Sequence, residues 1–183
     1  ATVLNLMSTN KIAQIPIIND EKKIIGLHLW EELQPKKDLP NTMVIMAGGR
    51  GIRLHPHTSN CPKPMLLIHG KPILEHIINH AISYGIKHFV LAIHYLGHII
   101  ENFFGNGDKF GVKIEYLRET SPLGTAGALS LIKNKPKETF IVANGDVLVD
   151  IDYAELINYH QENKASATMA VSYTHLRAHE TRE

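Results

Sequence analysis

The chain has 183 residues, of which 44% are hydrophobic, and its formal net charge is +1. This balance is typical of a globular protein with its own core, and it argues against a broad surface for nucleic acid or a membrane, which would carry a strong basic excess. The single cysteine, Cys61, excludes an internal disulfide framework and, with no membrane-span or signal-peptide pattern in the sequence, leads us to expect a cytoplasmic protein.

Residues 1–33 predict a small unit with the order helix, strand, strand, helix. The expected helices cover 3–12 and 30–33, and the expected strands cover 15–18 and 23–29. The stretch "KIAQIPIINDEKKIIGLHLWEEL" resembles the last half of a CBS motif, a regulatory module that works as a pair and often binds adenine nucleotides. That family commonly holds a ribose with Thr and Asp, where this chain has Leu29 and Glu32. A nucleotide-binding regulatory segment and a structural arm without a ligand therefore both stay open.

Residues 43–170 alternate predicted strands and helices, after a linker at 34–42 ("QPKKDLPNT") whose two prolines disfavour helix. The expected strands cover 43–47, 88–93, 112–117 and 139–143, and the expected helices cover 72–84, 96–104, 125–132 and 153–162, the last capped by Asp152. A strand-like run follows at 167–170. Repeated strand–helix–strand units with short links predict an α/β fold with a doubly wound, mostly parallel sheet and with ligands outside the carboxyl ends of its strands.

The segment 171–183 ("VSYTHLRAHETRE") continues none of these patterns. It resembles the translation of a sequencing-library adapter, so we expect it to be an artefact rather than native sequence. The chain also starts inside a predicted helix, and we expect it to be a piece of a longer protein.

The stretch "MVIMAGGRGIRLHPHTSNCPKPML" begins as a buried strand and continues as an irregular loop. Gly48, Gly49 and Gly51 follow the strand directly, where backbone amides can turn toward an anion without side chains in the way. Arg53 adds a planar charged fork that suits phosphate, and Lys63 adds a point charge on a flexible stem. The loop lacks the Gly-Lys-Ser/Thr of a P-loop and the spacing of a dinucleotide fingerprint. Together these residues predict a clamp for a triphosphate.

The part "AGGRGIRLHPHTSNCPKPML" resembles the signature of sugar-1-phosphate nucleotidyltransferases, which is G-G-x-G-x-R-L-x-P-L-T followed by P-K-P. Supporting motifs follow in order, "SPLGTAGAL" at 121–129 and "NGDVLVD" at 144–150, and His57 stands where leucine is usual. The resemblance covers 42–170 and implies the N-terminal part of a Rossmann-like, GT-A-like nucleotidyltransferase fold. With the CBS-like segment, the chain is similar to fused CBS–nucleotidyltransferase proteins, some of which form GDP-sugars.

The resemblance implies that a phosphate oxygen of a sugar 1-phosphate attacks the α-phosphorus of a nucleoside triphosphate and that pyrophosphate leaves. In that scheme the glycine amides hold phosphates, Arg53 stabilises the departing pyrophosphate and Lys63 lies near the α-phosphate. Asp146, expected just past a strand, would bind Mg²⁺, which prefers one or two carboxylates with phosphate oxygens and water.

Glu119 and Gly124 are expected to meet the base. An ionised glutamate only accepts hydrogen bonds and so complements the N–H donors of guanine, which makes GTP the preferred donor. A solvated loop charge at Glu119 stays open as an alternative. Asn144 and Gly145 are expected to approach the sugar.

The residues leave two other functions open, a regulatory protein that only senses a nucleotide and an inactive relative that serves as an assembly subunit. The presence of Arg53, Lys63 and Asp146 together favours the enzyme. We expect the chain to bind Mg²⁺-nucleotide but to form no nucleotide sugar by itself. An adenine nucleotide at a complete CBS pair and a homo-oligomer remain open. The histidines between 55 and 98 show no ligand spacing repeated around a strand end, and His175 and His179, spaced like helical metal ligands, lie in the expected artefact. Neither the histidines nor Cys61 are assigned any chemistry.

Overall fold

A computed structural model describes residues 2–33, 38–121, 123–133 and 136–171. The chain divides into two compact units, Ala1–Lys37 and Asp38–Glu183, and this division falls inside the predicted linker 34–42. Apart from Val171, the expected adapter segment 171–183 lies outside the described residues. Within the described part of the chain, no helix is long and apolar enough to cross a membrane.

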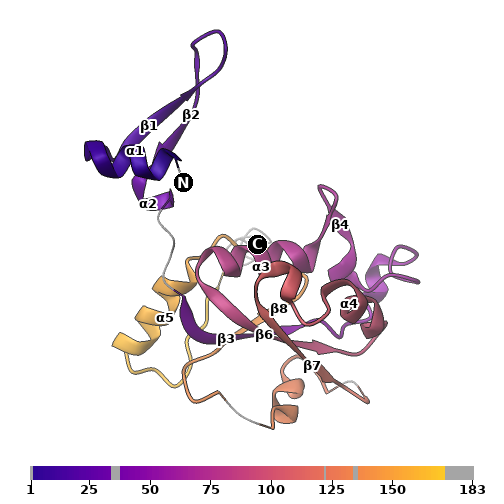
Figure 1. Ribbon diagram of the computed structural model, residues 1–183. Coiled ribbons are helices and arrows are strands. Elements are labelled where there is room, and N and C mark those ends of the chain that lie inside the picture. The colour runs from indigo at the N-terminus through magenta and orange to yellow at the C-terminus, as the bar shows by residue number, and fades with distance from the viewer. Residues whose placement is uncertain (1, 34–37, 122, 134–135, 172–183) are drawn as a thin grey trace, which may run out of the picture. The chain divides into compact units, whose positions relative to one another are not determined.

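The first unit is a β-hairpin with a helix at each end, drawn in indigo in Figure 1. Its elements are α1 (Thr2–Asn10), β1 (Gln14–Ile18), β2 (Ile24–Leu29) and α2 (Trp30–Leu33), and the two strands pair antiparallel. The turn between the strands is closed by Asn19, whose Oδ1 accepts a hydrogen bond from the backbone of Lys23 at 2.9 Å. This element order is the one that the sequence predicts.

The second unit is built on a four-stranded parallel sheet. Its strands are β3 (Leu39–Met46), β6 (Ile86–Ile93), β7 (Lys113–Arg118) and β8 (Ile141–Asn144), in the spatial order β7-β6-β3-β8. β3 pairs with β6 on one side and with β8 on the other, and each of the three pairings is parallel. The connections therefore reverse direction across the sheet at β3, which is the kind of switch point where α/β proteins bind ligands. The predicted α/β fold with a parallel sheet is confirmed.

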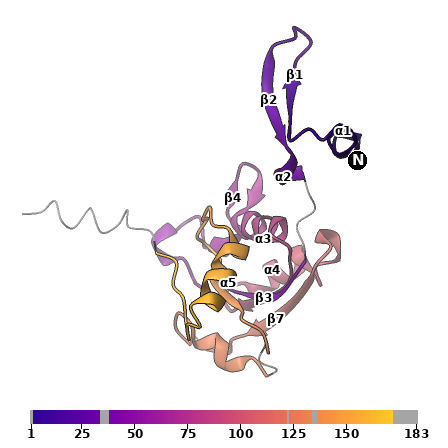
Figure 2. The same cartoon turned by 90° about the vertical axis from the view of Figure 1, so that its left-hand side faces the viewer.

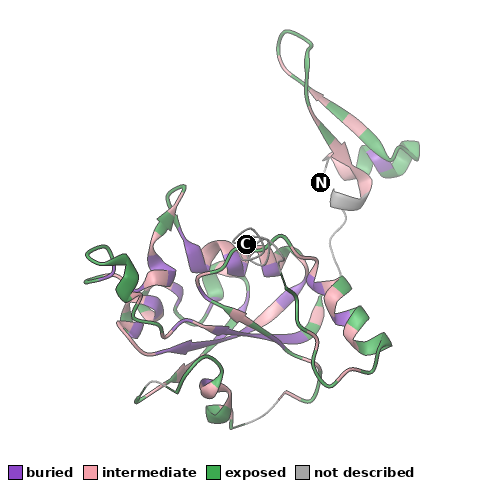
Figure 3. Ribbon diagram, turned by 180° about the vertical axis from the view of Figure 1, so that it is seen from behind, coloured by how far each residue is buried: buried purple, intermediate pink, exposed green. Residues whose placement is uncertain are grey.

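Three helices pack together on this sheet. α3 (Ile73–Ser83), α4 (Gly97–Phe104) and α5 (Tyr153–Glu162) join alternate residues of β3 and β6 in one apolar core. Figure 3 shows these strands as the buried centre of the unit. The 3-10 helix η4 (Gly127–Leu131), orange in Figures 1 and 2, lies on the opposite side of the sheet from α3 and α4. The unit also contains η1 (Ile52–Leu54), η2 (Lys63–Met65), η3 (Asp108–Phe110) and a hairpin of β4 (Leu67–Ile68) and β5 (Lys71–Pro72).

Apart from shifts of one or two residues at element ends and the short β4–β5 hairpin, the structure differs from the predicted elements at three places. β3 begins at Leu39, inside the predicted linker, because the backbone N–H of Leu39 bonds to Gly85 and the Asn41 side chain donates to the carbonyl of Thr139 at 2.7 Å. The helix expected at 125–132 is only the short η4, which fits the low helix propensity of its Gly127. The run at 167–170 is not a strand.

Candidate active site

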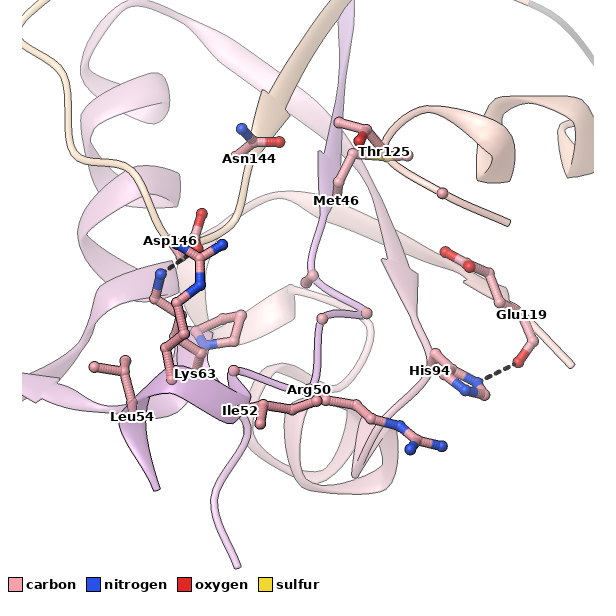
Figure 4. Close-up of a pocket in the computed structure, with 17 residues that line it drawn as sticks. Met46, Arg50, Ile52, Leu54, Lys63, His94, Glu119, Thr125, Asn144 and Asp146 are labelled. Atoms are coloured by element: carbon pink, nitrogen blue, oxygen red, sulfur yellow. Dashed lines mark hydrogen bonds and ion pairs between the residues drawn. The ribbon is translucent and has the colours of Figure 1, made fainter. Parts of the chain in front are cut away.

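A cavity of about 980 Å³ lies at the carboxyl ends of the four parallel strands (Figure 4). The loop after β3 forms one wall, His94 follows β6, Glu119 follows β7, and Asn144 and Asp146 stand at and just beyond the end of β8. The eight residues predicted to act on the nucleotide or the metal line this one cavity: Gly48, Gly49, Gly51, Arg53, Lys63, Glu119, Gly124 and Asp146. Of the two residues expected near the sugar, Asn144 also lines it, whereas Gly145 is not among its described lining residues. The sheet thus collects at one edge residues that lie far apart in the sequence.

The three glycines of the first loop differ in how strongly the structure requires glycine. Gly51 has φ 61, in the left-handed region, and a Cβ there would lie 3.1 Å from Cγ2 of Thr58 and 3.2 Å from Cβ of Lys63. A Cβ on Gly48 would lie 3.2 Å from Cβ of His94, so the loop passes close to the end of β6. A Cβ on Gly49 would meet no atom within 4 Å, which leaves the backbone there open to the cavity. This arrangement suits backbone amides that bind an anion.

Lys63 and Asp146 form an ion pair inside the cavity. Nζ of Lys63, in η2, lies 2.5 Å from Oδ2 of Asp146, and the two side chains are 34% and 32% exposed (Figure 4). Asp146 is held beside β3 because the backbone N–H of Gly145 donates to the carbonyl of Met46 at 2.9 Å. A Cβ on Gly145 would lie 3.1 Å from that same carbonyl oxygen, so this close approach favours glycine. A cation and a carboxylate therefore meet next to the glycine loop.

Glu119 is held by three hydrogen bonds on the other side of the cavity. Its backbone N–H donates to Ile93 at 3.0 Å, which continues the ladder between β6 and β7, and its carbonyl accepts from Nδ1 of His94 at 2.9 Å. Its carboxylate Oε2 accepts from the backbone of Leu123 at 3.1 Å. Figure 4 shows this carboxylate turned toward the side of the cavity where Thr125 lies. Glu119 is thus an ordered residue of the site, with Oε2 engaged in its own loop.

The residues present fit a magnesium ion held by one carboxylate. Among the described residues, no group of three or more His, Cys, Asp or Glu side chains is placed to hold a metal. Mg²⁺ commonly needs only one or two carboxylates when substrate phosphates supply further oxygens, and Asp146 lines the same cavity as the glycine loop. The donor set therefore suits an ion that arrives with a nucleotide better than a permanently bound metal.

The sequence interpretation missed Arg50, His94 and Thr125, which also line the cavity. His94 is one of the histidines to which the sequence assigns no chemistry. Its position as the first residue after a central strand was the available signal, because ligands of α/β sheets bind at those strand ends. Arg50 lies within the glycine loop itself, and Thr125 follows Gly124 directly.

Cys61 is not activated as a nucleophile. Burial raises the pKa of its thiol above the ordinary value, and its Sγ lies 3.7 Å from the carbonyl of Pro62. A raised pKa lowers the thiolate fraction at neutral pH, which agrees with a structural role for this residue.

Comparison with known proteins gives one family and several relatives. The family model described as "Nucleotidyl transferase" matches residues 42–181. A mannose-1-phosphate guanylyltransferase from Mycobacterium tuberculosis is 40% identical over 127 residues, which are 69% of this chain and 35% of the relative. The catalytic subunit beta of mannose-1-phosphate guanylyltransferase from Danio rerio is 34% identical over 133 residues, 70% of this chain and 37% of the relative.

Solved structures give a matching result. The crystal structure of HddC from Yersinia pseudotuberculosis complexed with GMP-PN has a TM-score of 0.57 and 31% identity, and the match covers 66% of this chain and 54% of HddC. The chain therefore spans about a third of the length of the first two relatives and about half of this structure.

Proposed function

Because the chain belongs to the nucleotidyl transferase family, we propose that it is part of an enzyme that transfers a nucleoside monophosphate from a nucleoside triphosphate to a sugar 1-phosphate. The observation that carries this proposal is the single cavity at the strand ends, lined by the glycine loop, Arg53 and the Lys63–Asp146 pair. Such a set of amides, cations and one carboxylate suits a polyphosphate with a divalent cation.

In the proposed reaction the protein aligns two anions and stabilises the charge that develops between them. The amides of Gly48, Gly49 and Gly51 bind phosphates of the nucleotide, Arg53 stabilises the departing pyrophosphate, and Lys63 acts near the α-phosphate. No covalent intermediate with the protein is needed, so positioning and electrostatics supply the rate acceleration.

Asp146 would hold Mg²⁺ in this scheme. The ion, when bound, would neutralise phosphate oxygens and favour departure of pyrophosphate. Since Oδ2 of Asp146 contacts Lys63, the ammonium group and the ion would share one carboxylate, and Lys63 would remain within reach of the phosphates.

We propose GTP as the nucleotide donor and a sugar 1-phosphate such as mannose 1-phosphate as the acceptor. The names of the relatives support this choice, and so does the nucleotide in the HddC complex. Glu119 offers only hydrogen-bond acceptors when ionised, which suits the N–H groups of guanine, and Gly124 lines the same cavity.

The identity and ligand of the first unit are the subject of a separate proposal. We propose that it is the end of a CBS domain, on the resemblance of residues 11–33, and that an adenine nucleotide would require a complete pair of such motifs. Titration of AMP and ATP into the full chain and into a chain without residues 1–37 tests this. The proposal predicts equal responses, because this chain carries only part of one motif. A response that is lost with residues 1–37 would contradict the need for a complete pair. The cytoplasmic location, supported by the single cysteine, is likewise proposed.

Thermal unfolding in the presence of Mg²⁺ and each of GTP, UTP, dTTP and CTP tests the proposed function. A ligand that binds only the folded state raises the unfolding temperature, so GTP should give the largest rise. The variant Lys63→Met should lose most of this rise, whereas Lys71→Met, which removes a lysine that does not line the cavity, should keep it. The absence of any rise with all four nucleotides would reject the proposal, and equal rises would reject the role of Glu119.

A further inference from the structure

Tyr95, the second residue after β6, contacts both ends of the glycine loop, by which we mean residues 48–59. Its backbone N–H lies 3.4 Å from the carbonyl oxygen of Gly48, where the loop begins. Its hydroxyl group donates to the distal part of the loop, at 2.8 Å from the carbonyl of Ser59 and 3.2 Å from that of Thr58. Tyr95 therefore connects the two ends of the segment 48–59, which belongs to no strand.

Thr58 extends this connection into the glycine turn. Its side chain is fully buried, with 0% exposure, and its Oγ1 donates to the carbonyl of Gly51 at 2.9 Å. The methyl group of Thr58 packs where a Cβ on Gly51 would lie, at 3.1 Å. Hydrogen bonds thus run from the Tyr95 hydroxyl through Thr58 to the residue whose φ sets the direction of the loop amides.

Tyr95 lies in a tight turn that the core holds in place. It follows the buried strand β6, and the next residues turn sharply into α4, where Leu96 has φ 50 and Gly97 packs against Ile93. The backbone N–H of Gly97 donates to the carbonyl of His94 at 3.3 Å and closes this turn. Because the turn between β6 and α4 is fixed by the core, Tyr95 can hold the glycine loop in place.

We propose that Tyr95 is a positioning residue for nucleoside triphosphate binding, which holds the two ends of the glycine loop so that its amides face the polyphosphate. The inference rests on the proposed function, since it concerns the same site. Tyr95 is not one of the described residues that line the cavity, so its effect must pass through the loop. A loop that is already ordered costs less conformational entropy when the ligand binds, which increases affinity.

The variant Tyr95→Phe tests this inference, with Tyr116→Phe as the matched control. Tyr116 also donates its hydroxyl to a backbone carbonyl, that of Gly105 at 2.7 Å, but it does not line the cavity. Both variants therefore lose one hydroxyl that donates to backbone carbonyls, which is shared between two carbonyls at Tyr95 and given to one at Tyr116. We expect Tyr95→Phe to weaken Mg²⁺-GTP binding by about fivefold in calorimetric titration, and Tyr116→Phe to leave it unchanged.

Two further measurements separate positioning from general destabilisation. Urea unfolding of both variants gives the cost in stability, and tripolyphosphate, which has no base or sugar, should lose the same factor of affinity as GTP in Tyr95→Phe. The double variant Tyr95→Phe with Thr58→Val should lose less than the sum of the two single losses, because both act on one loop.

The possible outcomes are distinct. If the wild-type chain binds no nucleotide, the proposed function fails and the inference fails with it. If the wild type binds and Tyr95→Phe behaves like Tyr116→Phe, only the inference is overturned. A loss for GTP without a loss for tripolyphosphate would also overturn it, because the effect would then lie outside the phosphate loop.

Discussion

Lys63 and Asp146 are 83 positions apart in the sequence, yet their charged atoms lie 2.5 Å apart. Neither is deeply buried, so each can still exchange its partner for a ligand. A carboxylate beside a triphosphate is unfavourable unless a cation lies between them, since like charges repel at short range. We therefore expect the Asp146 carboxylate to strengthen nucleotide binding when a divalent ion is present and to weaken it when none is present.

The variant Asp146→Asn should show this reversal in GTP affinity. With Mg²⁺ we expect binding to be weaker than in the wild type by about tenfold, because a charged ligand of the ion is lost. With EDTA we expect binding at least as tight as in the wild type, because the repulsive carboxylate is gone. Calorimetric titration in both buffers measures this, with Asp150→Asn as the control. An equal loss in the two buffers would contradict the magnesium role.

His94 should act on base preference through the backbone of Glu119. A carbonyl oxygen only accepts, so Nδ1 of His94 must donate in the 2.9 Å bond to Glu119. We expect His94→Ala to reduce the preference for GTP over UTP by a few fold, about the value of one hydrogen bond. Asparagine keeps a donor near that position, so His94→Asn should retain more of the preference. Competition binding of the two nucleotides measures it, and equal behaviour of the two variants would argue against this role.

The residues expected to bind phosphate could be predicted from the sequence, whereas the residues that position their loops could not. Three glycines, an arginine and a lysine after one strand are rare enough to indicate an anion site. His94 and Tyr95 use side chains to bind backbone carbonyls of distant segments, and those contacts depend on the order of strands in the sheet. A pattern of residue types carries no information about such a contact.

Among the elements, α5 begins at the N-cap residue that the sequence predicts. Oδ1 of Asp152 accepts from the backbone N–H groups of Ala154 at 2.8 Å and Glu155 at 3.0 Å, so Asp152 is the predicted N-cap. Tyr153 and Ile157 of this helix are buried in the core. The cap therefore stabilises a helix that the core needs but that does not line the cavity.

The variant Asp152→Ala should lower the free energy of unfolding by about 1 kcal/mol, the usual value of an N-cap side chain. GTP affinity should not change, because α5 lies outside the cavity wall. Urea unfolding and calorimetric titration measure the two quantities. The variant Asp150→Ala removes a neighbouring carboxylate that makes neither bond, and it should be nearly neutral. Equal destabilisation by the two variants would show that the two cap hydrogen bonds do not stabilise the helix.

Strand β7 should become less stable at high pH because of Tyr116. Burial, helped by the nearby carboxylate of Glu101 and opposed by Arg118, raises the pKa of Tyr116 from 10.0 to about 12. A folded-state pKa above the unfolded value means that the stabilisation is fully present below pH 10.0 and is lost as the pH rises toward about 12.

The difference in stability between the wild type and Tyr116→Phe measures this effect. We expect it to shift against the wild type by roughly 1 kcal/mol between those two pH values, because phenylalanine cannot ionise. This is less than the full pKa shift would give, since solvent screens the charge on a partly exposed group. Unfolding in urea across this range is the measurement. A difference that stays constant with pH would show that Tyr116 ionises as readily in the folded chain as in the unfolded one.

Long, regularly patterned elements were predictable, and their boundaries were less so. α5 has the predicted bounds because a cap and a helical pattern coincide. β3 starts earlier than predicted because its first residues gain partners from Gly85 and Thr139, which are distant in sequence. η4 stops short of a full helix in a segment interrupted by Gly124 and Gly127, where backbone freedom competes with helix propensity.

At the scale of the whole molecule, the cavity belongs to one unit. Every described residue that lines it falls between Met46 and Asp146, and the second unit has its own apolar core. Removal of residues 1–37 should therefore change the affinity for Mg²⁺-GTP by less than about twofold, within the effect of distant, independent sites. Calorimetric titration of the two chains measures this. A larger loss would mean that the first unit contributes to nucleotide binding.

The architecture was predictable as a class because strand and helix periods alternate, and the rule that ligands bind at carboxyl strand ends then gave the location of the site. The order of the strands had to come from the structure. It places β3 between β6 and β8, so that the loop after β3 faces residues from both neighbours.

A crystal structure of the chain with Mg²⁺ and GTP would locate the bound polyphosphate. We expect the triphosphate in the cavity, with its oxygens at the amides of Gly48 to Gly51, between Arg53 and Lys63, and with the ion on Asp146. A nucleotide bound elsewhere, or a cavity without one in saturated crystals, would contradict it.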